Sequence, residues 1–352
     1  MILHNKISKN KIWASVFLAQ VFLFFILSKV LVAISWAELF FEIQKKTHQL
    51  LFAWLPFSFG DWFYVVLILA LLYFIIKIFS KRNRKKAISK FLITLNILYF
   101  LYQIFWGLLY FQTPLIEKLP QEPPKIEEAK QLATKYLELC KTTRTKVKED
   151  QNGVFTIQNL SSIENEILIQ QQNLPSEINS KKPTNVNSFK SSLFQKVMSF
   201  SGIMGYYNPF SAEAQYNPHL PATQLPFTLA HESAHQLGYA REQEANFIGY
   251  LIGKNAKDEA LKYSTEYFVL KNLLYAISQQ DEEFVKQIIQ NYSPEMKKDQ
   301  MAERLFIEKH KGLLDAFFGF TNDLFLKSNQ QEGSITYSYF IDLLIRYERN
   351  HP

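Results

Sequence analysis

The sequence HESAHQLGYAREQEAN, at residues 231–246, has the spacing that most constrains this chain. On an α-helix, positions i and i+4 share a face, so His231 and His235 can reach one metal ion. Glu232 lies about 100° further round the helix, where it can hold a water molecule and remove its proton. Zinc suits such ligands and needs no redox partner. The pattern predicts a zinc centre with Glu232 as catalytic base; the alternative is two structural histidines on an ordinary helix.

The third ligand is expected shortly after the histidine pair. Gly238 can adopt the left-handed conformation that ends a helix, and a new helical pattern begins near Glu242. A short connector would bring Glu242 back under the histidines. Glu244 lies roughly 200° from Glu242 on that second helix, so both cannot face the metal. We favour Glu242 as the ligand over Glu244, and expect Asn246, one turn after Glu242, to support one of the histidines.

These residues resemble the site of the zincin metallopeptidases, and among them the gluzincins, in which a Glu on a second helix completes the zinc site. In several such families the ligand Glu is followed four residues later by Asp or Asn, as Glu242 is followed by Asn246. The gap between the two helices is shorter than in most gluzincins and is similar to that of metzincins, which use a third His. The resemblance implies Zn²⁺ as cofactor, a peptide or protein substrate, and hydrolysis of peptide bonds.

The chain is similar, over more of its length, to an uncharacterised bacterial multi-pass membrane family known only as domain of unknown function 3810. That similarity covers the N-terminal apolar spans, the His-Glu-x-x-His core and three further segments, at residues 57–61, 208–217 and 333–337. It implies no substrate.

Three long apolar segments occupy the first third of the chain, at about residues 12–34, 62–79 and 91–111. About 20 apolar residues cross a hydrocarbon core as a helix. Lys29 and Lys77 interrupt two of the segments, and their ammonium groups can extend to the lipid headgroups. We expect three transmembrane helices in residues 1–113. The first could instead be a cleaved signal sequence, but its apolar stretch is longer than the ~7–15 residues typical of one.

The distribution of charge predicts the orientation. Seven Lys and Arg lie within residues 77–90, at the end of the second segment and before the third, whereas Lys45 and Lys46 are the only ones between the first and second. The positive-inside rule then places the N-terminus in the cytoplasm and residues 114–352 in the periplasm or outside, anchored in the cell inner (cytoplasmic) membrane. The net charge of +7 lies entirely in the first part, because residues 114–352 hold 26 basic and 29 acidic residues. A nucleic-acid partner is therefore not expected.

The fold predicted for residues 114–352 is a mainly α, zincin-like soluble domain with a small β element, because most of it has helical periodicity. Residues 211–217 are expected to form a strand, either a substrate-binding edge strand or an ordinary connection. The single cysteine, Cys140, excludes an intramolecular disulfide and a zinc site built on several cysteines.

A phenol could stabilise the oxyanion of a peptidase reaction. The candidates, each of which could equally be a core or rim residue, are Tyr206, Tyr207, Tyr239 and Tyr337. Arg241 is expected to pair with Glu244, three residues on.

Two other functions fit the same sequence. One is a non-catalytic zinc-binding membrane interaction protein, which the intact Glu232 disfavours because structural binding does not need that carboxylate. The other is a zinc hydrolase acting on a non-peptide envelope substrate, which the sequence does not separate from a peptidase.

Overall fold

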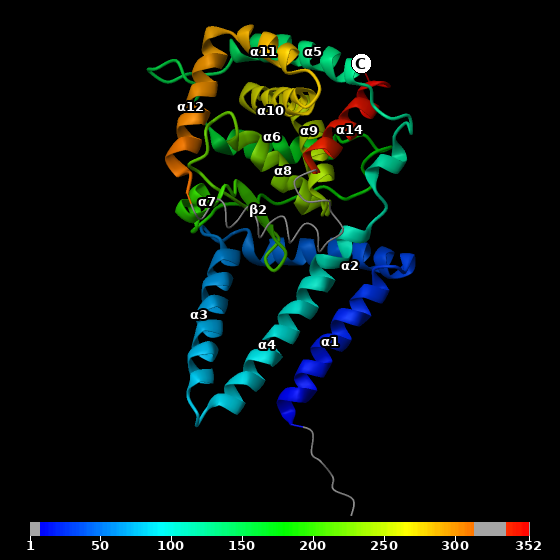
Figure 1. Ribbon diagram of the computed structural model, residues 1–352, viewed down its shortest axis with the longest axis vertical. Coiled ribbons are helices and arrows are strands. Elements are labelled where there is room, and N and C mark those ends of the chain that lie inside the picture. Colours follow the sequence, from blue (N-terminus) through cyan, green and yellow to red (C-terminus); the bar gives the residue numbers. More distant parts are fainter. Residues whose placement is uncertain (1–7, 313–335, 352) are drawn as a thin grey trace, which may run out of the picture.

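The computed structural model describes residues 8–312 and 336–351 (Figure 1). The chain is mainly helical with one small sheet, as predicted. Residues 333–335 and the side chain of Tyr337, which belong to the last segment of family similarity, lie outside the described residues.

Three helices among the described residues are long and apolar enough to cross a membrane: α1 (Lys9–Leu27), α3 (Phe59–Phe79) and α4 (Arg84–Phe105). All three extend from the same side of the remaining structure (Figure 1). Their bounds correct the predicted segments 12–34 and 91–111. The first helix ends at Leu27, because the backbone turns through residues 28–30. The third ends at Phe105, and Gly107–Phe111 form a separate, largely buried 3₁₀ helix, η1.

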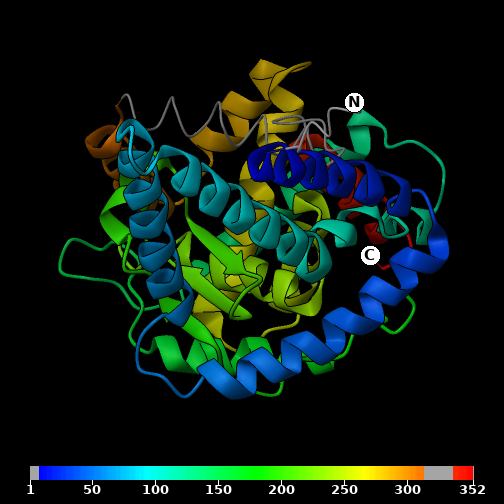
Figure 2. The same cartoon turned by 90° about the horizontal axis from the view of Figure 1, so that it is seen from below.

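A fourth N-terminal helix, α2 (Leu31–Phe52), occupies the segment that we had expected to be a loop between two spans. It lies across the ends of α1, α3 and α4, between them and the rest of the protein (Figures 1 and 2). Two of its buried residues, Ile34 and Ala37, pack with Phe24 of α1 and Leu108 of η1. The other four contact the domain; they are Phe41, Gln44, Lys45 and Gln49.

The domain above α2 is built around α8 (Leu225–Leu237), α9 (Glu242–Lys254) and α10 (Glu259–Ser278), which pack on one another (Figure 1). Large apolar and aromatic side chains such as Phe247, Tyr250 and Tyr267 are fully buried there. Further helices surround this core: η2 (Leu115–Lys118), α5 (Ile126–Arg144), α6 (Leu160–Gln172), α7 (Gln195–Ser201), α11 (Glu282–Gln290), α12 (Pro294–His310) and α14 (Thr336–Glu348).

The sheet has three short strands, β1 (Phe189–Ser191), β2 (Gly205–Asn208) and β3 (Glu213–Tyr216), in the order β1-β3-β2. Strand β3 is parallel to β1 and antiparallel to β2, with Gly205 opposite Tyr216. The segment that we expected as a possible edge strand, residues 211–217, is therefore the central strand. The exposed edge beside the α8 helix belongs to β2.

A second, smaller core joins the N-terminal helices to the domain. It combines Phe41 of α2 and residues after α4 with residues from β2, the β2–β3 turn and the α8–α9 connector; its members are Phe41, Trp106, Leu109, Tyr110, Tyr207, Ala212 and Ala240. We call this set the junction core. It contains residues from both sides of residue 113, where we had expected the domain boundary.

Two buried acidic residues hold helices together. Asp299 of α12 accepts hydrogen bonds from Arg144 Nε at 2.6 Å and from Tyr263 Oη at 2.7 Å. Glu348 of α14 accepts from Lys135, Lys254 and Tyr250. Burial alone would raise the pKa of Glu348, but these hydrogen bonds lower it below its usual value.

Candidate metal centre

The local backbone that creates the site follows the prediction. Helix α8 has Pro226 in its first turn, where a missing N–H costs no helical hydrogen bond. It ends at Gly238, whose φ of 104° is left-handed, and the Gly238 N–H donates to the carbonyl oxygen of His235. The chain reverses there, and α9 begins at Glu242. This reversal sets the first turn of α9 beside the last two turns of α8.

The three residues predicted as ligands come together. Glu242 Oε2 lies 3.2 Å from His231 Nε2, and Glu242 Oε1 lies 3.6 Å from His235 Nε2. One ligand atom from each residue lies within 4.8 Å of the other two, close enough to hold one metal ion. The side chain of Glu242 is 35% exposed, so the cluster opens to solvent at this carboxylate.

Glu244 is turned away from the histidines. Its carboxylate accepts a hydrogen bond from the backbone N–H of Leu115 at 2.9 Å and pairs with Arg241 at 3.0 Å, as expected for Arg241. Because it is buried, our alternative description of Glu244 as a surface carboxylate is wrong. It fastens the start of α9 to η2.

The outer nitrogen of each imidazole faces an oxygen. His231 Nδ1 lies 2.8 Å from Asn246 Oδ1, and His235 Nδ1 lies 2.6 Å from the carbonyl oxygen of Tyr239. An oxygen acceptor requires that Nδ1 carry the proton, which leaves Nε2 of each ring as the nitrogen that faces the cluster and could bind a metal ion. The support that we expected from Asn246 is present and acts on His231.

Glu232 is buried beside the cluster, and its Oε2 has no hydrogen-bond partner among the described residues. Burial, with a smaller contribution from the charge of Glu242, raises its pKa to about 8. Strand β2 passes directly against this carboxylate: a Cβ atom at position 205 would lie 2.7 Å from Glu232 Oε1. Gly205 therefore gives the strand its close approach.

Glu242 and His231 form a charge pair within the cluster. Burial alone would raise the pKa of Glu242, but the hydrogen bond from His231 and the charge of His235 lower it to about 2. Burial opposes charge on His231 as well, and the same carboxylate raises the His231 pKa to about 9. Burial lowers the pKa of His235 to about 4, so this ring stays neutral. Two imidazoles and one carboxylate, with an unpartnered buried carboxylate oxygen beside them, fit the donor set of a zinc site that keeps one position open.

Two aromatic residues of the site were missed in the sequence because they lie within the predicted third span. Trp106 caps α4, and its ring packs edge-on against His235 with 5.7 Å between ring centroids. Trp106 Nε1 donates to the hydroxyl of Tyr110 in η1 at 3.3 Å. Burial raises the pKa of Tyr110, and the charge of Glu242 raises it further. Within residues 91–111, Gly107 was the one residue that indicated an end of the helix before residue 111.

The predicted oxyanion donors divide into two groups. The Tyr206 hydroxyl donates to Asp61, and the Tyr239 hydroxyl donates to Asn179 Oδ1 at 2.7 Å, so both phenols have other partners. The hydroxyl of Tyr207 is buried without a partner among the described residues, and its ring packs on Trp106. The side chain of Tyr337 lies outside those residues.

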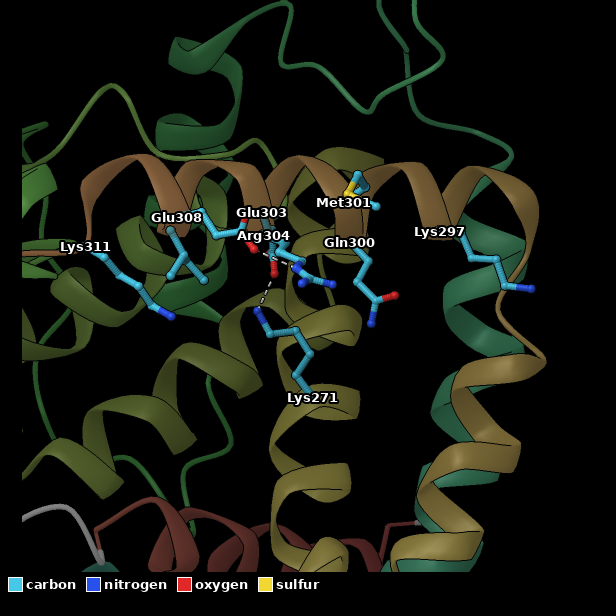
Figure 3. Close-up of a pocket in the computed structure, with 9 residues that line it drawn as sticks. Lys271, Lys297, Gln300, Met301, Glu303, Arg304, Glu308 and Lys311 are labelled. Atoms are coloured by element: carbon cyan, nitrogen blue, oxygen red, sulfur yellow. Dashed lines mark hydrogen bonds and ion pairs between the residues drawn. The ribbon is translucent and has the colours of Figure 1, made fainter.

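A surface cavity of about 540 Å³ lies elsewhere, between α10 and α12 (Figure 3). Four of its six charged side chains pair with one another, Lys271 with Glu303 at 2.6 Å and Arg304 with Glu308 at 2.8 Å. No residue of the metal cluster lines it, so we place the chemistry at the cluster.

Comparison with known proteins identifies one family. The family described as "Protein of unknown function (DUF3810)" matches residues 36–345, a range that includes most of α2, the sheet and the metal cluster. Neither the curated proteins nor the solved structures contain a match to the chain.

Proposed function

The chain belongs to the family described as "Protein of unknown function (DUF3810)", and from its site we propose that it is a membrane-anchored, zinc-dependent peptidase. The observation that carries the proposal is the convergence of His231, His235 and Glu242 beside the buried, unpartnered oxygen of Glu232. A site that only bound zinc would need the three ligands but not a second carboxylate with a free oxygen.

In this proposal His231, His235 and Glu242 hold the metal. Zinc bound there would supply a Lewis acid that activates water and polarises the scissile carbonyl. Glu232 accepts a proton from the attacking water and later donates it to the leaving amine. Its raised pKa suits both steps near neutral pH, because the ideal catalytic pKa lies near the working pH.

The surrounding residues orient these groups. Asn246 and the Tyr239 carbonyl fix the two imidazoles, and the Trp106 ring packs against His235. The free edge of β2, next to Glu232, offers backbone groups on which a substrate could lie in an extended conformation.

We further propose that α1, α3 and α4 cross the cell membrane, with the basic turn between α3 and α4 in the cytoplasm and the metal cluster on the outer side. A C-terminal alkaline-phosphatase fusion should then be active and a C-terminal green-fluorescent fusion dark. The reverse pair of results contradicts this orientation.

The metal assignment is tested by elemental analysis of the full chain purified in detergent. Wild type should carry one zinc ion, and His231→Ala or Glu242→Ala should lose it because each removes a metal bond. Glu232→Gln should keep it. Glu282→Gln is a matched control, since that side chain is 73% exposed on α11. Full zinc in a double His231→Ala, His235→Ala variant contradicts the proposal.

The activity is tested by comparing cleavage products across the proteome of cells that express wild type or Glu232→Gln at equal levels. Products specific to wild type and to Glu282→Gln, and missing with Glu232→Gln, are the expected result. Identical products from wild type and both variants, with zinc bound in each, would show that the protein binds zinc but is not a peptidase.

A further inference from the structure

One face of α2 is apolar and has no partner within the described structure. Four outward side chains recur three or four residues apart, and a fifth follows two turns later, beyond the exposed Lys46 and Thr47. These five are each between 61% and 68% exposed; they are Val32, Trp36, Leu39, Ile43 and Leu50. Such spacing forms a stripe along one face, interrupted near its C-terminal end by Lys46 and Thr47. A stripe of large apolar side chains in water is unfavourable, so it requires an occupant.

The charged and polar side chains of α2 are mostly turned to the opposite side. Glu38 pairs with Lys181 at 2.6 Å, Glu42 pairs with Lys45 at 2.8 Å, and Gln44 donates to the carbonyl oxygen of Pro209. Lys46 is the one charged side chain within α2 that is exposed, and a lysine can extend its ammonium group to lipid headgroups. The helix therefore presents its apolar surface outward and its charges to the domain.

The position of α2 indicates what covers the stripe. Three residues separate it from the end of α1 and six from the start of α3, and both neighbours are apolar helices that extend away from the domain (Figure 1). If those neighbours cross a bilayer, both ends of α2 lie at the same membrane surface, and the helix runs parallel to it. Trp54, beyond the last turn of α2, is 75% exposed, and tryptophan is enriched at membrane–water interfaces.

We propose that α2 is an in-plane helix whose apolar stripe is embedded at the boundary between the headgroups and the acyl chains of the bilayer. Amphipathic helices bind there through their apolar face. The inference rests on the membrane anchorage alone and holds whether or not the metal cluster is a peptidase.

This placement of α2 sets the distance between the metal cluster and the membrane surface. The ring of Phe41, on the buried face of α2, packs against Gly238 at the end of α8; a Cβ atom there would lie 2.9 Å from the ring. His235 is three residues before Gly238 and contacts Trp106 at the end of α4. The α2 helix, with the side chains of Phe41 and Trp106, therefore lies between the cluster and the membrane surface. The cluster would act on polypeptide that lies close to the bilayer.

The experiment measures the depth of α2 in the full chain, reconstituted into vesicles of phosphatidylethanolamine and phosphatidylglycerol. Ile43→Cys and Leu50→Cys are each labelled with an environment-sensitive fluorophore; the native Cys140 is fully buried and should not react. Lys146→Cys, half exposed at the far end of α5, is the control. Unlabelled wild type reports any reaction at Cys140.

Lipids brominated in their acyl chains should quench the labels at positions 43 and 50 several-fold more than the label at 146, and aqueous iodide should do the reverse. Strong iodide quenching at position 43 or 50 would overturn the proposal, because the stripe would then face water. A disulfide-linked dimer of unlabelled Ile43→Cys, together with a label at position 43 that is shielded from both quenchers, would also overturn it and identify a second copy as the occupant. Zinc content and peptidase activity do not enter either readout.

Discussion

The close approach of β2 to Glu232 makes Gly205→Ala a sensitive test of the site. The added Cβ would lie 2.7 Å from Glu232 Oε1, 2.8 Å from Glu232 Cγ and 2.9 Å from the backbone oxygen of Gln215. Contacts below 3.0 Å force an atom to move. The Gln215 oxygen is fixed within β3, so the carboxylate has to give way. Overpacking of this kind costs about 1–3 kcal/mol.

We expect two effects of Gly205→Ala. The unfolding midpoint should fall, by about 2 °C for each kcal/mol in a chain of this size. Turnover of a substrate found by the cleavage comparison should fall about 100-fold, since a displacement of about 1 Å of a catalytic group can cost that much. The zinc content should not change, because the alanine would not touch the three ligands.

The matched control is Gly312→Ala. It makes the same chemical change at a position where a Cβ atom would have no neighbour within 4 Å. The midpoint is measured by thermal unfolding in detergent, and the zinc content by elemental analysis. If Gly205→Ala matched Gly312→Ala in midpoint and turnover, β2 would not pack against Glu232 as we describe.

Three further predictions follow from single contacts. Asn246→Ala should weaken zinc binding about 10–100-fold in a chelator competition, because His231 loses the group that orients its ring. Asp299→Asn should cost about 3 kcal/mol in the free energy of unfolding, because it removes the buried partner of Arg144 and leaves that charge only the half-exposed Glu149 at 3.4 Å. Glu348→Gln should cost about 2 kcal/mol at pH 7. The folded pKa of this carboxyl is below the usual 4.5, so the stabilisation by the ionised carboxylate is present above pH 4.5 and is lost as the pH falls through the folded pKa. Thermal unfolding measured at pH 7 and at pH values below 4 should show that the difference between Glu348→Gln and wild type disappears at low pH.

The parts of the site that could be predicted are set by local geometry. The helical repeat places His231 and His235 on one face, and Gly238 ends the helix where a left-handed residue is needed. With a connector that short, Glu242 falls beneath the histidines and Glu244 does not. Each step depends on residues fewer than five positions apart, so the sequence alone supports it.

The parts that could not be predicted depend on distant contacts. The segment of α2 was interpreted as a loop between two spans. It contains the charged residues Glu38, Glu42 and Lys45, and nothing in the sequence shows that their charges pair on the domain side. Residues 91–111 form one uncharged run in the sequence. Nothing in that run shows that the helix ends before Trp106 or that Trp106 packs on His235. Which strand forms the sheet edge depends on the pairing of β1 with β3, across more than twenty residues.

The junction core has a consequence for how this protein could change during evolution. In many membrane-tethered enzymes the anchor is a module that can be exchanged without touching the catalytic domain. Here Phe41, Trp106 and Tyr110 belong to the same core as Tyr207 and Ala240, and Gln112 donates to the carbonyl oxygen of Gly238. A gene fragment that begins after residue 113 would encode only part of that core. The long apolar N-terminal helices and the helix with the histidines are therefore inherited as one unit.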